Sequence, residues 1–335
     1  MKEPLGAAVI GLGHGLSHAR AYAANPRTRL MVVCDTRADH ARAIAAELGA
    51  PRWTTDYREV LDDPGIDVVS IATPDLLHPD QCVAAMEAGK HVLCEKPLAL
   101  TVEGCTRIIE ASRRTGMLTM VGQSCRYAPA FQTAHQLICE GAIGELFFVE
   151  SEYAHHYEHA AGVNQWRIDR RRHPVIGGGC HAVDLLRWIA GDPIEASAYS
   201  NHKCLLDWPV DDTAIAILRF PDNIVGKVFI SIGCRRPYTM RSTFYGVRGT
   251  IICDNTSTAM QVHRHGVDEH DKFSELPVSV ANHNVEAEVE ELAEALVNGR
   301  PLTTDVVEGA RTVVVCDAIV EATKTGQPVQ VRYPW

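Results

Sequence analysis

The chain has 335 residues, a length that suggests two domains and allows a sizeable buried core. Hydrophobic residues make up 46% and charged residues 22%, which is typical of a globular protein and unlike a disordered or fibrous one. The net charge of −10 argues against a nucleic-acid-binding surface, and no apolar run approaches the roughly 20 residues that cross a bilayer. We therefore expect a globular protein that binds neither nucleic acid nor membrane.

The eleven cysteines are scattered along the chain, and no two of them form a CxxC pair. Several lie in apolar runs, such as Cys34 and Cys316. This distribution is typical of buried thiols in a reducing compartment rather than of disulfides or a zinc ribbon. The start of the sequence also lacks a signal-peptide pattern, so the sequence predicts a cytoplasmic location.

The first third of the chain alternates short apolar runs with segments of helical period. The predicted strands are 5–10, 29–34, 67–72, 91–94 and 118–121, and the predicted helices are 17–24, 39–48, 81–88 and 102–114. Strands that alternate with helices form parallel βαβ units. This part of the chain is therefore expected to be a doubly wound α/β domain.

The pattern changes after about residue 123. A helix at 129–140 precedes predicted strands at 145–153, 195–200, 213–220, 225–232, 243–245 and 250–254, with one clear helix, 181–190, between them. Strands joined by short turns indicate an antiparallel sheet. The tail returns to helix at 284–297 and 305–325, where Asp305 and Glu308 have capping-box spacing and Gly326 is a plausible stop.

These patterns predict three segments. Residues 1–124 are expected to form a nucleotide-binding α/β domain, and residues 125–303 a second domain around the open sheet. Residues 304–335 are expected to form a C-terminal helix and tail that pack back toward the first domain. The boundary is marked by a change in pattern, not in composition.

A glycine-rich loop, residues 11–16, follows the first predicted strand and precedes the first helix. Glycine lets the backbone approach a phosphate closely, and a helix N-terminus offers it free N–H groups. The third glycine stands at 15 rather than 16. Asp35 ends the next strand, where an acid can bond the ribose 2′-hydroxyl of NAD. Arg37 could instead bind a 2′-phosphate, so NADP remains open.

Two further segments follow predicted parallel strands. The first contains Ala72-Thr73-Pro74 and His78, and the second is Glu95-Lys96-Pro97. Ligands of open α/β sheets bind at the carboxyl ends of the strands. The sequence therefore predicts that both segments lie at the same edge as the glycine loop.

On these residues the sequence resembles the Gfo/Idh/MocA oxidoreductases over nearly the whole chain. The most specific match is Glu95-Lys96-Pro97 after Ala-Gly-Lys-His-Val, and further matches are Arg126-Tyr127-x-Pro129, 141–145, Trp166-Arg167 and 181–187. The resemblance implies an N-terminal Rossmann domain and a second α+β domain with an open-faced, mainly antiparallel sheet. It also implies NAD(P)-dependent hydride transfer at a carbinol of a sugar, glycoside or cyclitol.

The resemblance further implies which residues act. Lys96 would orient the substrate hydroxyl and stabilise the alkoxide, and His181 would be the general base. The expected cofactor contacts are Gly11, Leu12, Gly13, His14, Gly15, Leu16, Asp35, Thr36, Arg37, Thr73, Pro74, His78, Glu95, Lys96 and Gln123. The expected substrate contacts are Lys96, Arg126, Tyr153, His155, Trp166, Arg167, His181 and Asp184.

The chain departs from the family pattern at one position. Many relatives carry an aspartate four residues before the catalytic histidine, whereas this chain has Gly177. Asp184, three residues after His181, and Asp169 are the two candidates to replace that carboxylate.

Three histidines, His155, His156 and His159, are concentrated in one short segment. The segment carries no zincin-type motif, so hydrogen bonding to substrate is expected there rather than a metal site, and a solvated loop is the remaining alternative.

Two other functions fit the same sequence. An enzyme could retain NAD and use transient oxidation for elimination or glycoside cleavage, or the chain could be a non-catalytic NAD or sugar sensor.

The second sheet also bears on quaternary structure, because the strands 213–220 and 225–232 are apolar on both faces. Since one face of their sheet would be left uncovered, we expect a homodimer or homotetramer through that face.

Overall fold

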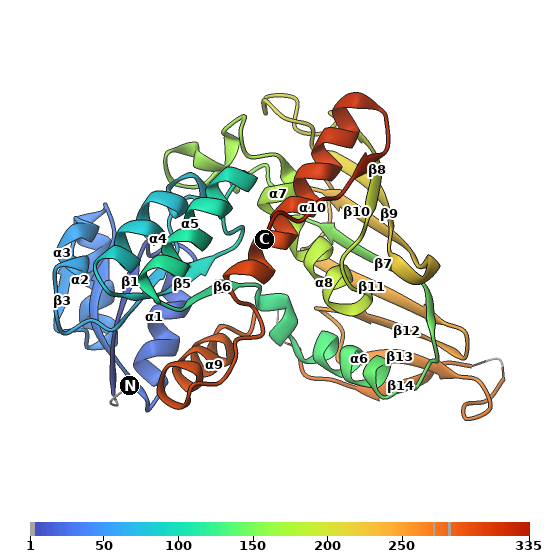
Figure 1. The fold of residues 1–335 in the computed structure, drawn as a ribbon, viewed down its shortest axis with the longest axis horizontal. Helices are drawn as coiled ribbons and strands as arrows, with labels where there is room; N and C mark the ends of the chain where they lie inside the picture. Colours follow the sequence, from blue (N-terminus) through green and yellow to red (C-terminus); the bar gives the residue numbers. More distant parts are fainter. Residues whose placement is uncertain (1–3, 271, 281–282) are drawn as a thin grey trace. The chain divides into compact units, whose positions relative to one another are not determined.

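The structure is a computed structural model in which residues 4–270, 272–280 and 283–335 are described (Figure 1). The chain divides into two compact units. The first consists of residues 1–123 and 284–310, and the second of residues 124–283 and 311–335.

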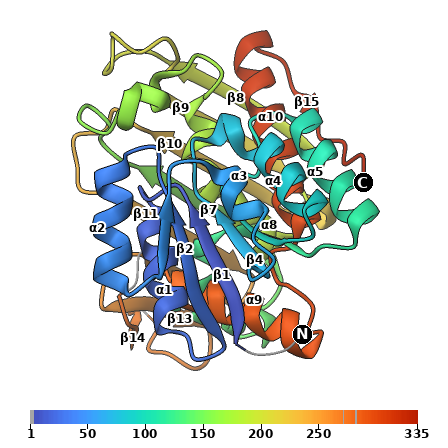
Figure 2. The same ribbon diagram turned by 90° about the vertical axis from the view of Figure 1, so that its left-hand side faces the viewer.

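The first unit is built on a six-stranded parallel sheet. Its strands are β1 (Leu5–Ile10), β2 (Thr28–Cys34), β3 (Arg52–Thr54), β4 (Val68–Ile71), β5 (His91–Glu95) and β6 (Thr119–Gly122). Their order is β3-β2-β1-β4-β5-β6, the doubly wound arrangement with its switch point between β1 and β4. Figure 2 shows β1, β2 and β4 side by side. The carboxyl ends of these strands are where a ligand is expected.

Every residue of β1 and of β4 is buried, as expected where helices cover both faces of a parallel sheet. The helices of this unit provide that cover. They are α1 (Gly15–Ala24), α2 (Ala38–Leu48), α3 (Tyr57–Leu61), α4 (His78–Glu87), α5 (Val102–Thr115) and α9 (Val285–Asn298), with a 3₁₀ turn at Asp75–Leu77. Figure 1 shows α4 and α5 next to each other, and α9 beside α1. Asn25 donates a hydrogen bond of 2.8 Å to Glu290, which joins the end of α1 to α9.

The second unit contains a nine-stranded sheet in the order β14-β13-β12-β11-β7-β10-β9-β8-β15. Its strands are β7 (Leu146–Ala154), β8 (Glu195–Asn201), β9 (Thr213–Arg219), β10 (Val225–Ser231), β11 (Thr239–Gly246), β12 (Gly249–Asp254), β13 (Ala259–Arg264), β14 (Ser274–Pro277) and β15 (Val329–Gln330). Neighbouring strands are antiparallel except β7 and β10, which pair in parallel. The sheet is therefore mainly antiparallel, as predicted.

Helices α6 (Pro129–Cys139) and α8 (Cys180–Ala190) pack against this sheet, α8 on β7 and β10 and α6 on β12. The remaining helical elements are α7 (Pro174–Gly177), α10 (Val306–Thr325) and 3₁₀ turns at Ser124–Tyr127, Val163–Ile168 and Pro221–Asn223. Along β9 the side chains alternate, so that Ala214, Ala216 and Leu218 are buried while Ile215 and Ile217 are exposed. One face of the sheet therefore carries exposed apolar residues.

The division of the chain differs from the predicted one in two places. Residues 284–303 belong to the first unit rather than the second, because α9 packs on α1 and the N–H of Val121 donates to the carbonyl of Thr304 at 2.8 Å. Residues 311–335 cluster with the second unit, where β15 extends the sheet beside β8. Both differences arise from contacts between residues far apart in sequence.

Four strands were absent from the sequence-based prediction: β3, β13, β14 and β15. β3 has three residues, two of them exposed, and all four residues of β14 are exposed. Short or exposed edge strands lack the apolar pattern on which strand prediction depends. The predicted start of α10 is confirmed, because Asp305 accepts hydrogen bonds from the N–H groups of Val307 and Glu308.

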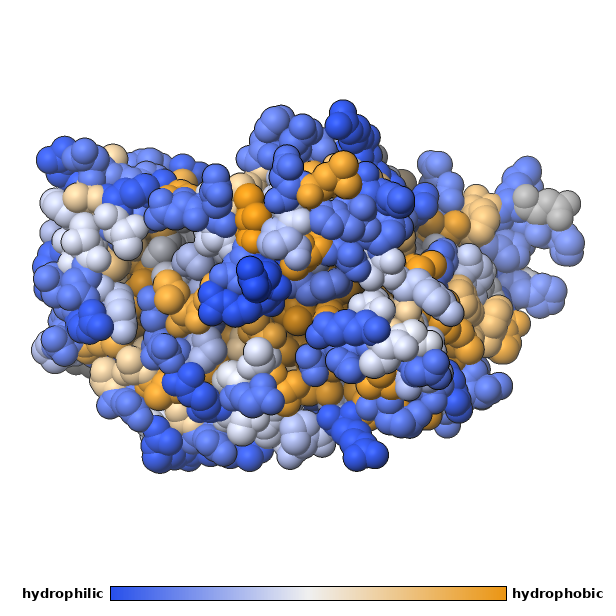
Figure 3. All heavy atoms as spheres, turned by 90° about the horizontal axis from the view of Figure 1, so that it is seen from above, coloured by the Kyte–Doolittle hydropathy of each residue, from blue (hydrophilic) through white to orange (hydrophobic). Residues whose placement is uncertain are grey.

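No helix among the described residues is long and apolar enough to cross a membrane. In the view of Figure 3 most surface residues are hydrophilic, with hydrophobic residues in groups between them.

Candidate active site

The glycine-rich loop begins where β1 ends. Gly11 has φ of 88°, and a Cβ there would lie 2.6 Å from the carbonyl oxygen of Ala72, so only glycine fits. At Gly13, by contrast, a Cβ would meet no atom of the described residues within 4 Å. The loop therefore leaves space in front of the N-terminus of α1, as a bound pyrophosphate requires.

Asp35, directly after β2, braces this loop. Its Oδ2 accepts a hydrogen bond of 3.0 Å from the N–H of Leu12, and Arg37 donates to both carboxylate oxygens at 2.9 and 3.0 Å. Burial acts to raise the pKa of Asp35, but the hydrogen bonds from Arg37 and Leu12 outweigh it and lower the pKa. An ionised carboxylate at the end of β2 fits the ribose 2′-hydroxyl of NAD.

His78 ties together the segments that follow β4 and β5. Its buried ring places Nδ1 2.9 Å from the carbonyl oxygen of Pro97 and Nε2 3.0 Å from that of Thr73. The hydroxyl of Thr73 donates to Gln81 at 2.5 Å, and Pro74 precedes the 3₁₀ turn. The predicted cofactor residues after β4 therefore lie in a braced loop at the same sheet edge as the glycine loop.

Glu95 and Lys96 stand at the end of β5. The buried Oε1 of Glu95 lies 3.0 Å from Nε2 of His18 and 3.5 Å from Nε2 of His14, while Oε2 accepts a hydrogen bond from the N–H of Lys96. Burial acts to raise the pKa of Glu95, but His14, His18 and Lys96 together hold it well below the usual range. Lys96 is half-buried, and its charge is one of those that lower the pKa of Glu95.

Two buried polar side chains of the first unit have atoms without a hydrogen-bond partner among the described residues. They are Gln123, through Oε1, and Glu288, through both carboxyl oxygens. Burial, and then the charges of Glu95 and Glu291, raise the pKa of Glu288 well above its usual value, against the opposing effect of Lys96. The free hydrogen-bonding atom of Gln123, the space at Gly13 and the ionised Asp35 fit a bound dinucleotide.

In the second unit, His181 is the second residue of α8 and is 1% exposed. Its Nδ1 lies 3.3 Å from Sγ of Cys125. Its ring stacks with that of Tyr153 at a centroid distance of 6.2 Å and lies 5.3 Å from the ring of His283. The predicted general base is thus fixed by packing on several sides.

The space beside Gly177 is taken by an arginine. A Cβ at Gly177 would lie 2.3 Å from Nη1 of Arg172, whose Nη2 donates to the Gly177 carbonyl at 2.9 Å. Arg172 is 5% exposed, and its guanidinium also lies 4.9 Å from the ring centre of Trp166. At the position where the family resemblance led us to expect an aspartate, this chain therefore places a buried cation.

Both aspartates that could replace the missing carboxylate are paired with arginines. Asp184 is fully buried and accepts two hydrogen bonds of 2.7 Å from Arg126 and one of 2.8 Å from Thr312. Asp169 is held by Arg171, whose hydrogen bonds lower its pKa to about 2. The predicted substrate residues Arg126 and Asp184 thus form an internal ion pair, and their contact with substrate stays a prediction.

The other predicted substrate residues belong to a set of aromatic and histidine side chains. The hydroxyls of Tyr153 and Tyr157 are 2.7 Å apart, and the ring of Tyr238 lies 5.5 Å from Tyr153 and 5.0 Å from His155. Burial raises the pKa of Tyr153 well above its usual value, so its hydroxyl keeps its proton. Arg167 lies 4.5 Å from the ring centre of Trp166.

The three-histidine segment is not helical, so His155 and His159 do not share a helix face. His156 instead lies 3.2 Å from Glu158. The groups of described residues whose ligand atoms are close enough to hold a metal ion do not include these histidines.

Models of two protein families match the chain. An oxidoreductase family with an NAD-binding Rossmann fold matches residues 5–123, and the Gfo/Idh/MocA C-terminal domain matches residues 131–252. The chain belongs to the Gfo/Idh/MocA family. The predicted fold, the NAD cofactor and the oxidoreductase class are thereby confirmed for this member.

Several curated relatives of this Gfo/Idh/MocA chain are sugar or cyclitol enzymes. It is 30% identical to a 1,5-anhydro-D-fructose reductase of Ensifer adhaerens, over 89% of each chain, and 28% identical to a scyllo-inositol 2-dehydrogenase (NAD(+)) of Bacillus subtilis (strain 168), over 98% of this chain and 97% of the relative. Among solved structures, levoglucosan dehydrogenase in complex with NADH and levoglucosan has a TM-score of 0.90 and 26% identity, covering 98% of this chain and 99% of the other.

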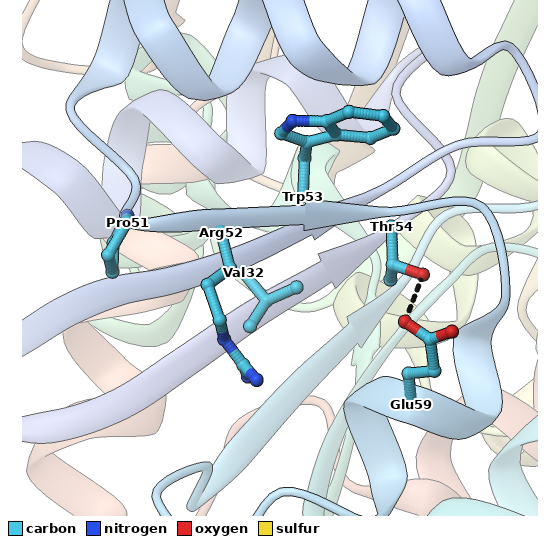
Figure 4. Close-up of a pocket in the computed structure, with 6 residues that line it drawn as sticks. All are labelled: Val32, Pro51, Arg52, Trp53, Thr54 and Glu59. Atoms are coloured by element: carbon cyan, nitrogen blue, oxygen red, sulfur yellow. Dashed lines mark hydrogen bonds between the residues drawn. The ribbon is translucent and has the colours of Figure 1, made fainter.

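One surface pocket is lined by none of these residues, although the carbonyl of Thr54 in its wall accepts a hydrogen bond of 3.2 Å from the N–H of Asp35. It has a volume of about 290 Å³ and is lined by Val32, Pro51, Arg52, Trp53, Thr54 and Glu59 (Figure 4). In Figure 4 Trp53 projects from the opposite side of β3 to Arg52 and Thr54, and the hydroxyl of Thr54 donates to Glu59 at 2.6 Å. None of the predicted site residues lines it, so we do not assign the Gfo/Idh/MocA chemistry to this pocket.

Four residues near the site were missed by sequence reasoning: Cys125, Arg172, His283 and Glu288. For Glu288 a signal existed, because it shares the spacing of the apolar residues Val285, Val289 and Leu292 on one face of α9. A carboxylate on a buried face indicates a special environment. For the other three, no local pattern in the sequence distinguishes them.

Proposed function

We propose that this chain is an NAD-dependent dehydrogenase that oxidises a hydroxyl group of a sugar, glycoside or cyclitol. The observation that carries the proposal is the Glu95–Lys96 pair, which stands at the same sheet edge as the glycine loop and Asp35. A lysine ammonium at that edge is suited to a hydroxyl that loses its proton during hydride transfer. The polyol substrates in the names of the relatives support the substrate class.

Each residue has a defined role in this proposal. Bound NAD supplies the hydride acceptor. Lys96 donates a hydrogen bond to the substrate oxygen and stabilises its developing negative charge, beside the buried carboxylate of Glu95, whose pKa is held well below its usual range. His181 accepts the hydroxyl proton through a ring nitrogen, and its packing against Tyr153 holds the imidazole without a carboxylate at position 177.

The test is NADH formation over a panel of sugars, glycosides and cyclitols with NAD and NADP. We expect oxidation of at least one polyol with NAD. On that substrate, His181→Ala should lower kcat about 10²–10⁴-fold, the usual effect of removing a general base. His202→Ala is the matched control, since His202 bonds the carbonyl of Leu205 in the same unit. Turnover without net NADH would instead indicate transient oxidation, and binding without turnover would indicate a sensor.

We also propose that the uncovered sheet face joins copies of this chain into a homodimer or homotetramer. Ile215 of β9 lies opposite Tyr199 of β8 and Phe229 of β10, and Tyr199 is 74% and Ile215 42% exposed. A contiguous apolar strip of this kind is typical of an interface. Sedimentation should show an oligomer that Ile215→Asp converts to monomer, whereas Leu206→Asp, at an exposed residue outside the strands, should not.

A cytoplasmic location remains part of the proposal. It is supported by the eleven cysteines, all of which are free thiols in the structure, as expected in a reducing compartment. Fractionation of cells that express the tagged chain would test it.

A further inference from the structure

Three side chains from separate segments of the second unit bring a sulfur and ring nitrogens together. Cys125 lies in the 3₁₀ turn Ser124–Tyr127, His181 is the second residue of α8, and His283 directly precedes Asn284, the N-cap of α9. Each offers one ligand atom, and these atoms all lie within 4.8 Å of one another. Cys125 and His181 are each 1% exposed, and His283 is half-buried.

A thiolate with two imidazoles is a donor set that suits Zn²⁺. Zinc bonds of about 2.3 Å to sulfur and about 2.0–2.1 Å to nitrogen, in tetrahedral geometry, place the ligand atoms roughly 3.3–3.6 Å apart. The distance from Sγ of Cys125 to Nδ1 of His181 is 3.3 Å, within that range. The ligand atom of His283 lies within 4.8 Å of the other two, so it would need to close by about 1.2–1.5 Å at most.

The surroundings also orient the third ligand. The hydroxyl of Ser124 lies 2.5 Å from Nδ1 of His283. The ring of Tyr238 stacks on His283 at 5.9 Å with an interplanar angle of 10°. Hydrogen bonds and ring packing of this kind fix the direction of metal-binding histidines.

A second group with metal-ligand geometry, His14, His18 and Glu95, is explained without a metal. Its carboxylate is already engaged by both histidines and by the N–H of Lys96, at the cofactor edge of the first unit. It therefore belongs to the site described above.

We propose that Cys125 Sγ, His181 Nδ1 and a ring nitrogen of His283 form a Zn²⁺ site with an open fourth position. Binding displaces the proton of the Cys125 thiol, so affinity should rise with pH. One consequence rests on the proposed function: bound zinc should inhibit the dehydrogenase. An imidazole that binds zinc through Nδ1 carries its proton on Nε2, so His181 could not act as a base. Zinc and the proton-accepting role of His181 therefore exclude each other.

The binding test uses the full chain, stripped of metal with a chelator and titrated with Zn²⁺ against a chromogenic competitor. We expect one equivalent per chain, with affinity lowered at least 10-fold in Cys125→Ser and in His283→Gln. Cys139→Ser is the matched control, because Cys139 also contacts a histidine, His135, but is exposed. With Co²⁺ in place of Zn²⁺, a thiolate-to-cobalt charge-transfer band should appear in the wild type and vanish in Cys125→Ser.

Absence of stoichiometric binding, or equal binding by wild type and both ligand variants, would overturn the site. Because Cys125 is buried and its replacement could disturb folding, the half-buried His283 provides a second variant, and the melting temperature of each is compared with wild type.

Inhibition of the dehydrogenase activity is measured in a separate experiment. With a dehydrogenase substrate, Zn²⁺ should inhibit in the concentration range in which it binds, and EDTA should restore the rate. Stoichiometric zinc without inhibition would support the metal site and refute His181 as the proton acceptor, so the two failures are distinguishable.

Discussion

Replacing Gly13 with alanine tests whether the glycine loop holds the cofactor in the way the structure indicates. No atom of the described residues lies within 4 Å of the added Cβ, and the backbone of Gly13 does not have positive φ. The free protein should therefore be as stable as wild type, or more stable by about 0.4–1 kcal/mol, because alanine restricts the unfolded chain. A methyl group in the path of the pyrophosphate should nevertheless weaken NAD binding at least 10-fold, which corresponds to about 1.4 kcal/mol.

Gly11→Ala provides the contrast two residues away. The left-handed backbone there costs a residue with a Cβ about 1–2 kcal/mol, and the contact of 2.6 Å with the Ala72 carbonyl adds about 1–3 kcal/mol. At about 2–4 °C per kcal/mol, this variant should melt roughly 4–20 °C lower than wild type even without ligand.

The assay is thermal unfolding with and without NAD, together with direct titration of NADH fluorescence. Wild type at an NAD concentration of 100 Kd should gain about 2.7 kcal/mol, whereas Gly13→Ala at the same concentration should gain only about 1.4 kcal/mol if its Kd is 10-fold higher. Wild-type NAD affinity in Gly13→Ala would refute the placement of the pyrophosphate at this loop. A loss of stability as large as in Gly11→Ala would show that Gly13 serves the fold instead.

Three further predictions concern charged residues of the first unit. Lys96→Ala should abolish turnover while the Kd for NADH stays near that of wild type; an equal loss of both would make Lys96 a cofactor ligand. Asp35→Ser should raise the ratio of kcat/KM for NADP to kcat/KM for NAD at least 10-fold. The substitution removes the carboxylate that would repel a 2′-phosphate, and it releases Arg37. Asp39→Ser, the control, should leave the ratio unchanged. Glu288→Gln should flatten the pH dependence of stability measured by urea unfolding. Because the folded pKa of Glu288 is raised, the unfolded chain loses this proton first, and wild-type stability should fall by about 1.4 kcal/mol per pH unit above the usual glutamate range until the folded state also ionises. Parallel stability profiles for wild type and variant would contradict this.

Local sequence patterns were sufficient to predict much of the structure of the first unit. The strand ends at Ile10 and Cys34, the glycine loop between β1 and α1, and the cap at Asp305 were all predicted, because each depends on residues that are neighbours in sequence. The Glu95-Lys96-Pro97 segment was found in the same way, as a short motif after a strand. The alternation of apolar runs and helical segments also predicted the parallel sheet, since a helix is the usual connection between two parallel strands.

Long-range packing decided the rest. The pattern of helix 284–297 was clear, but only its contacts with α1 and β6 assign it to the first unit, where Glu288 is buried. Nothing local to Gly177 shows that the guanidinium of Arg172 fills the space beside it. Cys125, His181 and His283 are likewise unremarkable in their own segments, and they become a possible ligand set only where the fold brings their ligand atoms together. Periodicity reports which face of an element is buried, whereas the identity of the buried neighbours depends on how distant elements pack.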